Sequence, residues 1–276
     1  MFIKAGGDRM VYLDYNVIIN VGKAKNKGFN SSFDYMRLNR EKFCVSFVII
    51  EEIVKSEKCN ELIELVKEIT SKCIWPSSNT GVEIKDISSI DQIVKNAMNY
   101  QTQDLVDANG ELAHKVISQY RELNKINYSK EFGNINNLSR DELWSLKMVQ
   151  DMMIAFQMDN VELKLLNFKE ENVNKVSHVF TALKNVLNSC GYNFDTNIQT
   201  ATSGIYDVTH MINARECSKF ITCDKRLANR VDAIYYLLNI ETEVVKMDDF
   251  AIQKNNETNK YDFKNEFQIL DFLKTI

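Results

Sequence analysis

Two short apolar runs, far apart in the chain, each end in an aspartate. Residues 10–13 lead into Asp14, and residues 220–223 lead into Asp224. Short apolar runs of this kind are typical of strands buried on both faces of a parallel sheet. In open parallel sheets, ligands bind at the carboxyl ends of the strands, near a switch in strand order. The pattern therefore predicts that the two acids lie near each other.

Helical patterns follow both strands. After Asp14, Asn16 offers an N-cap to a helix, and the apolar run 43–50 leads into a helix that starts near Glu51 and Glu52 and continues to residue 69. Strand–helix alternation at these lengths predicts an α/β fold with a central parallel sheet and helices on its faces. The elements expected in the last part of the chain are a helix at 206–217, a strand at 220–223, a helix at 227–240 and a strand at 243–247.

The middle of the chain has a different pattern. Residues 86–191 show apolar residues at helical spacing, with few helix-breaking residues, and Trp144, Met148, Met152 and Phe156 are expected to form a helical core. Pro76 and the polar residues after it are expected to end the preceding unit. The predicted organisation is a discontinuous α/β domain at 1–85 and 200–255, a large helical insertion at 86–199, and a C-terminal extension at 256–276.

Composition excludes several classes of protein. The 276 residues carry a formal net charge of −4, so the basic excess of a sequence-independent duplex binder is missing. The six cysteines form no C-x-x-C pair and only three histidines accompany them, which argues against a structural zinc site. The sequence shows neither a signal peptide nor an apolar run long enough to span a membrane. We expect a cytoplasmic protein with reduced thiols.

Two further acids occupy comparable places in the pattern. Glu52 follows the second expected strand, and Asp207 lies near the expected start of the helix before Asp224. If these residues converge with Asp14, four carboxylates share one small volume and repel one another unless a divalent cation neutralises them. Mg²⁺ or Mn²⁺ suits such a site, because both ions prefer oxygen ligands.

The four acids lie in motifs that resemble those of the PIN-domain nuclease family, in the family's order. The motifs are a strand that ends Leu-Asp14-Tyr-Asn16, Ser46 followed by Glu52, Asp207 with His210 and Ala214 on one helix, and a strand that ends Thr222-Cys-Asp224. Val244 and Val245 resemble the family's closing strand. The resemblance covers roughly residues 9–75 and 203–250, and the middle of the chain resembles a lineage-specific insertion.

The resemblance implies a PIN-like α/β/α sandwich and metal-dependent hydrolysis of phosphodiester bonds, in most members of RNA. In that interpretation Asp14, Glu52, Asp207 and Asp224 are the catalytic, metal-binding residues for Mg²⁺ or Mn²⁺. The residues expected to support them or to contact substrate are Asn16, Ser46, His210, Thr222 and Arg226. The family includes toxin ribonucleases paired with antitoxins. Candidate partners are therefore RNA or another single-stranded nucleic acid, an antitoxin or effector protein, and a second copy of the chain.

Several alternatives stay open at this point. Glu51 competes with Glu52 for the site, Asp207 could be a helix-capping acid, and His210 could be an ordinary core histidine. The main alternative function is a catalytically silent PIN-like module that binds RNA or protein. A haloacid-dehalogenase-like phosphatase would require a second aspartate at position 16, where Asn16 stands.

Overall fold

The computed structural model describes residues 10–77, 81–98, 103–158, 163, 173–194 and 198–258. A six-stranded sheet lies at its centre, in the order β4-β3-β2-β1-β5-β6. All neighbouring strands are parallel except β3 and β4, which are antiparallel. The predicted α/β class with a mostly parallel central sheet is confirmed. The strands are β1 (Val11–Leu13), β2 (Phe43–Ser46), β3 (Lys72–Ser77), β4 (Gly81–Asp86), β5 (Lys219–Thr222) and β6 (Glu243–Lys246).

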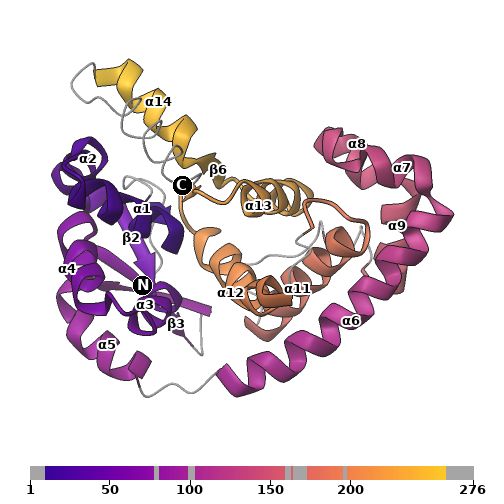
Figure 1. The fold of residues 1–276 in the computed structure, drawn as a ribbon, viewed down its shortest axis with the longest axis horizontal. Coiled ribbons are helices and arrows are strands. Elements are labelled where there is room, and N and C mark those ends of the chain that lie inside the picture. Colours follow the sequence, from indigo (N-terminus) through magenta and orange to yellow (C-terminus); the bar gives the residue numbers. More distant parts are fainter. Residues whose placement is uncertain are drawn as a thin grey trace.

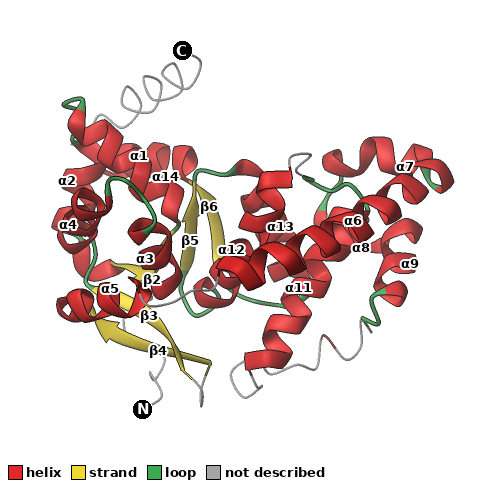
Figure 2. Ribbon diagram, turned by 60° about the horizontal axis from the view of Figure 1, so that its bottom comes forward, coloured by secondary structure: helices red, strands yellow, loops and turns green. Residues whose placement is uncertain are grey.

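Helices lie on both sides of this sheet, and the helices from the middle of the chain extend away from it (Figures 1 and 2). The helices that accompany the first strands are α1 (Tyr15–Asn26), α2 (Ser31–Leu38), α3 (Phe47–Val54), α4 (Cys59–Ile69) and α5 (Ile90–Met98). The middle of the chain forms α6 (Gln103–Asn127), α7 (Ser129–Asn134), α8 (Arg140–Ser145), α9 (Lys147–Ala155) and α11 (Val173–Ser189). The last helices are α12 (Ile198–Ala214), α13 (Lys225–Leu237) and α14 (Met247–Thr258), and short 3-10 turns are η1 (Arg40–Lys42), η2 (Ile87–Ser89) and η3 (Ile135–Asn137).

The strand order reverses at β1. The chain passes from β1 to β2 on one side and returns to β5 on the other side, so β1 has sequence-distant neighbours on its two edges. The crevice between such connections, beyond the carboxyl ends of the strands, is where open α/β sheets bind ligands. Tyr12 and Leu13 of β1 are fully buried, as are Phe220 and Ile221 of β5, so the two strands are fixed within the core.

Two local predictions near the second strand are wrong. The apolar run 43–50 is not one strand, because β2 ends at Ser46 and α3 begins at Phe47. A single helix does not continue to residue 69, because α3 and α4 are separate. The first error has a physical cause: residues 43–50 are all buried, and an apolar run that is buried on all sides does not distinguish a strand from a helix.

The region around Pro76 also differs from the prediction. Pro76 lies within β3, opposite Val82 of β4, in an antiparallel pair that forms one edge of the sheet. A proline is tolerated where its missing N–H group is not needed, and the pairing of β3 with β2 ends at Ile74, before Pro76. Residues 72–86 therefore contribute two strands where the sequence predicted only the end of a unit.

The middle of the chain is helical, as predicted. Met148 and Met152 are buried, and the indole Nε1 of Trp144 donates to the carbonyl oxygen of Ala233, 2.9 Å away. This bond joins α8 to α13, so the two parts of the chain pack together. α11 packs on α12, the helix that carries Asp207 (Figure 1). Within the part of the chain described, no helix is both long and apolar enough to cross a membrane.

Candidate active site

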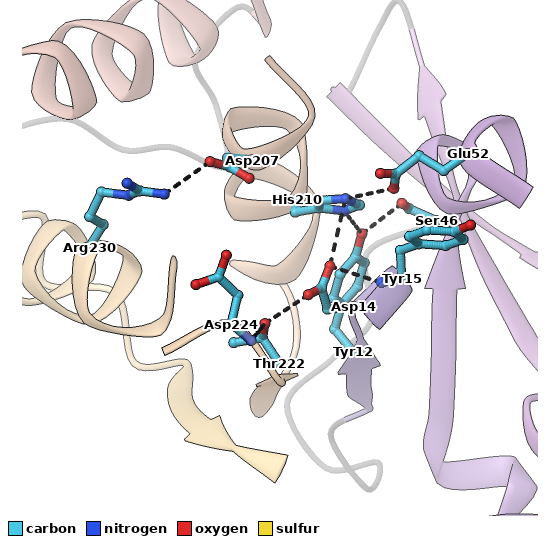
Figure 3. A network of polar contacts seen from close by, with 10 residues as sticks. All are labelled: Tyr12, Asp14, Tyr15, Ser46, Glu52, Asp207, His210, Thr222, Asp224 and Arg230. Atoms are coloured by element: carbon cyan, nitrogen blue, oxygen red, sulfur yellow. Dashed lines mark hydrogen bonds and ion pairs between the residues drawn. The ribbon is translucent and has the colours of Figure 1, made fainter. Parts of the chain in front are cut away.

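Asp14 follows β1 directly and is 2% exposed. Its Oδ1 accepts a hydrogen bond from the backbone N–H of Tyr15 at 2.8 Å, and Asp14 is the N-cap of α1. Its Oδ2 accepts a bond from Oγ1 of Thr222, at the end of the neighbouring strand β5, at 2.7 Å (Figure 3). The N-cap prediction for Asn16 is wrong: the helix begins at Tyr15, and Asn16 is exposed in its first turn.

Thr222 connects Asp14 to the fourth acid. Its Oγ1 also accepts from the backbone N–H of Asp224 at 3.0 Å. Asp224 is the N-cap of α13, where its Oδ1 accepts from the N–H groups of Arg226 and Leu227 at 2.8 and 3.0 Å. Thr222 thus bonds to the carboxylate of Asp14 and to the backbone N–H of Asp224, so it links the two strand ends. The side chain of Arg226 is exposed on the first turn of α13.

His210 of α12 lies between Asp14 and Glu52. Its Nε2 is 3.0 Å from Oε2 of Glu52 and 3.8 Å from Oδ1 of Asp14 (Figure 3). Its Nδ1 is 2.7 Å from the hydroxyl of Tyr12, and that hydroxyl is 2.7 Å from Oγ of Ser46. His210 is 2% exposed. A buried chain of contacts therefore runs from β2 through β1 to α12 and ends at Glu52 on α3.

The contact between His210 and Glu52 distinguishes Glu52 from the adjacent Glu51. Glu52 faces His210, while Glu51 is 7% exposed and points to a different side of α3, because neighbouring helical residues are about 100° apart. Glu51 is thus buried and does not lie on a solvated helix face. Glu52 is also not at the start of its helix: it occupies the last turn of α3.

Asp207 is held by two cations. Its Oδ2 lies 3.2 Å from a guanidinium nitrogen of Arg230 on α13 and 3.7 Å from Nζ of Lys184 on α11. Asp207 is in the interior of α12, so the helix-start prediction is wrong and a capping role is excluded. In Figure 3 its carboxylate lies on the same side of the site as that of Asp224, across from Asp14 and Glu52.

The environment of the site raises the pKa values of both Asp14 and His210. Burial, together with the negative charges of Glu52 and Asp207, raises the pKa of Asp14 to about 6, although His210 and Thr222 oppose this. Burial alone would lower the pKa of His210. The hydrogen bond and charge of Glu52 and the charges of Asp14 and Asp207 outweigh it and raise this pKa to about 9. At neutral pH His210 is therefore a buried imidazolium.

Asp14, Glu52 and Asp207 each have a positively charged partner in the structure. His210 neutralises Glu52 and Asp14, and Arg230 and Lys184 neutralise Asp207. Among the residues that the structure describes, no group of three or more His, Cys, Asp or Glu side chains is arranged as one metal-ligand set. The oxygen donors suit a hard cation such as Mg²⁺ or Mn²⁺. Glu52 contacts His210 through Oε2, and Asp207 contacts both cations through Oδ2, so each acid has a second oxygen to offer to such an ion.

Three residues of the site were not predicted from the sequence: Tyr12, Lys184 and Arg230. Tyr12 is two residues before Asp14, and residues two apart on a strand point to the same face. The sequence could therefore have placed Tyr12 on the same face as Asp14. Lys184 and Arg230 are ordinary helical cations in the sequence, and only the packing of α11 and α13 against α12 brings them to Asp207. No family model, curated protein or solved structure matches the chain.

Proposed function

We propose that the chain is a metal-dependent nuclease of the PIN-like type, with the α/β/α sandwich of that family, which hydrolyses phosphodiester bonds in single-stranded RNA. The supporting observation is the link from Asp14 through Thr222 to Asp224, at the carboxyl ends of two adjacent parallel strands. Glu52 and Asp207 lie near enough for their charges to raise the pKa of Asp14. In this proposal, acids from four separate segments act together at the point where the strand order reverses.

In this proposal Asp14, Glu52, Asp207 and Asp224 hold Mg²⁺ or Mn²⁺. The ion supplies the positive charge that lowers the pKa of a water molecule and stabilises the charge that develops on the phosphate. Asp14 is held in place by Tyr15 and Thr222 and needs no rearrangement. Glu52 is oriented by His210, and Asp224 keeps one oxygen for α13 and has a second oxygen to offer.

The test is cleavage of 5′-labelled single-stranded RNA and DNA of the same sequence, with Mg²⁺, with Mn²⁺ and with EDTA. We expect cleavage of RNA that requires the metal and is lost in Asp14→Asn. Asp34→Asn is the matched control, since Asp34 is an exposed acid on α2, paired only loosely with Arg37. Cleavage that persists in EDTA, or that survives in Asp14→Asn, would contradict the proposal.

A catalytically silent module that binds RNA or protein is the second candidate. The observation that favours it is the neutralisation of the acids by His210, Arg230 and Lys184, which makes the site stable without a metal. In that case the wild-type protein binds labelled RNA with the same affinity in Mn²⁺ and in EDTA and cuts neither nucleic acid. The cleavage assay and an affinity measurement on one preparation distinguish the two candidates.

A further inference from the structure

Helix α6 carries an exposed apolar stripe. Val116, Leu123 and Ile126 lie on it, with 39%, 54% and 75% of each residue exposed, and the exposed Gln119 lies between them. Successive members of the stripe are three, four and three residues apart, which is the spacing of a helix face that packs against another helix. A single exposed apolar residue is ordinary on a protein surface, but neighbouring ones that form a patch are typical of an interaction site.

The opposite side of α6 is already used by the fold. Ile117 and Asn124 are buried, and Nδ2 of Asn124 donates to the carbonyl oxygen of Ser189 on α11 at 3.0 Å. α6 also packs on α12, and Figure 1 shows it along the outer edge of the helices from the middle of the chain. The rotation of α6 about its own axis is therefore fixed, and the stripe is directed outward.

An open pocket of about 970 Å³ lies beside the stripe. The described residues that line it all belong to α6, from His114 to Ile126. A pocket of this size can take several side chains of a second helix, so the stripe and the pocket together form one docking surface.

Two opposite charges lie along one edge of the stripe. Lys115 and Glu122 are exposed and seven residues apart, and the contact of Glu122 with Lys125 in its own chain is long, at 4.0 Å, and exposed. When two copies of a helix pack antiparallel about a twofold axis, like edges meet, so Lys115 of one copy faces Glu122 of the other, twice. In a parallel pair this edge would meet the opposite edge, where Tyr120 and Asn127 carry no charge. The charges therefore fit an antiparallel pair of identical helices.

We propose that this surface is the interface of a symmetric homodimer, in which α6 of one copy packs antiparallel on α6 of a second copy. The twofold axis passes near Ser118, so that Val116 of each copy lies opposite Gln119 of the other. Leu123 and Ile126 then pack along the helix of the second copy. A pair of single helices is at the small end of interface sizes, so the dissociation constant should be micromolar. The surface is separate from the acid cluster, and the proposal does not depend on the nuclease function.

Sedimentation equilibrium of the full chain measures the dimer, at low ionic strength, where exposed charges are least screened. Wild type is compared with Lys115→Glu, with Glu122→Lys, and with the double variant that carries both changes. Each single variant places like charges opposite each other at two positions, so its dimer should be about tenfold weaker. The double variant restores opposite charges and should dimerise like the wild type. Lys130→Glu, at an exposed lysine on α7, is the control for net charge and should also keep the wild-type affinity.

A mixture of the two single variants gives a result that a folding defect cannot imitate. In the mixed dimer, one copy presents two negative side chains at the edge of the stripe and the other copy presents two positive ones. Each contact then joins opposite charges again. The mixture of Lys115→Glu and Glu122→Lys should therefore dimerise about as tightly as the wild type, although each variant alone does not.

Ile126→Ser tests the apolar part of the surface. Because this residue is 75% exposed, the change removes no core packing, and it should weaken the dimer while circular dichroism stays that of the wild type. A wild type that is monomeric at every concentration would leave the stripe to a partner of another kind and would overturn the proposal. A dimer that is insensitive to both charge reversals, or a mixture that associates no better than either single variant, would overturn it as well.

Discussion

The hydroxyl of Tyr12 lies 2.7 Å from Nδ1 of His210. Because the pKa of His210 is raised to about 9, both ring nitrogens carry protons at neutral pH. Nδ1 therefore donates to Tyr12, Nε2 donates to Glu52, and the hydroxyl hydrogen of Tyr12 is left to donate to Ser46. Tyr12 thus fixes the ring that orients Glu52.

We first predict the effect of removing this hydroxyl. Tyr12→Phe leaves the buried Nδ1–H of His210 without its acceptor, which should destabilise the protein by about 1–3 kcal/mol. Urea unfolding measures the change. Tyr120→Phe is the control, since Tyr120 is partly buried on α6, outside the site, and should cost much less. Equal losses in both variants would show that the Tyr12–His210 contact contributes nothing specific.

The second prediction concerns stability at alkaline pH. The pKa of His210 is raised from 6.5 to about 9 in the folded state, so its contribution is fully present below about pH 6.5 and is lost as the pH rises through 9. The wild type should lose on the order of 3 kcal/mol over this range. His210→Gln should show a much flatter profile.

Urea unfolding at pH 6.5 and at pH 9 measures this difference. His178→Gln is the matched control, since His178 is exposed on α11 and its removal should leave the profile of the wild type intact. Asp14 gives a second change of the same sign at lower pH. Its pKa is raised from 3.8 to about 6, so its ionisation destabilises the folded protein as the pH rises through that range.

The third prediction concerns the buried pair of Arg230 and Asp207. Arg230→Met leaves Asp207 with only the longer contact to Lys184 and removes a donor from Asn193, so unfolding should become easier by about 3–5 kcal/mol. The exposed pair of Lys25 and Glu68 supplies the control, and Lys25→Met should cost at most about 1 kcal/mol. Chemical denaturation measures the free energy of unfolding of both variants. A smaller loss of stability in Arg230→Met than in Lys25→Met would contradict the prediction.

The fourth prediction separates metal binding from helix capping at Asp224. Asp224→Ser keeps an N-cap side chain for α13, so the metal-free protein should stay within about 1 kcal/mol of the wild type. Metal that binds only the folded state stabilises the wild type by about 2.7 kcal/mol at a hundred times its dissociation constant. In Asp224→Ser and Asp14→Asn this gain should be much smaller.

Thermal melts with EDTA and with Mn²⁺ measure this gain. Asp34→Asn, which changes an exposed acid away from the site, should keep the full shift. Equal shifts in all four proteins would refute a shared metal site. A shift that is absent from the wild type itself would favour the silent module.

Some features of this protein follow from local sequence alone. An apolar run that ends in aspartate is a local pattern, and Asp14 and Asp224 do follow β1 and β5 and cap the next helices. Parallel pairing then brings the two strand ends together, so their link through Thr222 could be anticipated. The boundary at Ser46 and the hairpin around Pro76 could not, because burial on both faces removes the periodicity that distinguishes strand from helix.

The counter-ions of the acids were decided by tertiary structure only. From the sequence, we expected that a metal ion is needed to offset the repulsion among the carboxylates. The motifs that carry the acids can be recognised in the sequence. The cations that surround these acids in space cannot. Packing of α11, α12 and α13 brings Lys184, His210 and Arg230 to within 4 Å of those acids. A charge interaction depends on distance in space and on burial, and neither is encoded in separation along the chain.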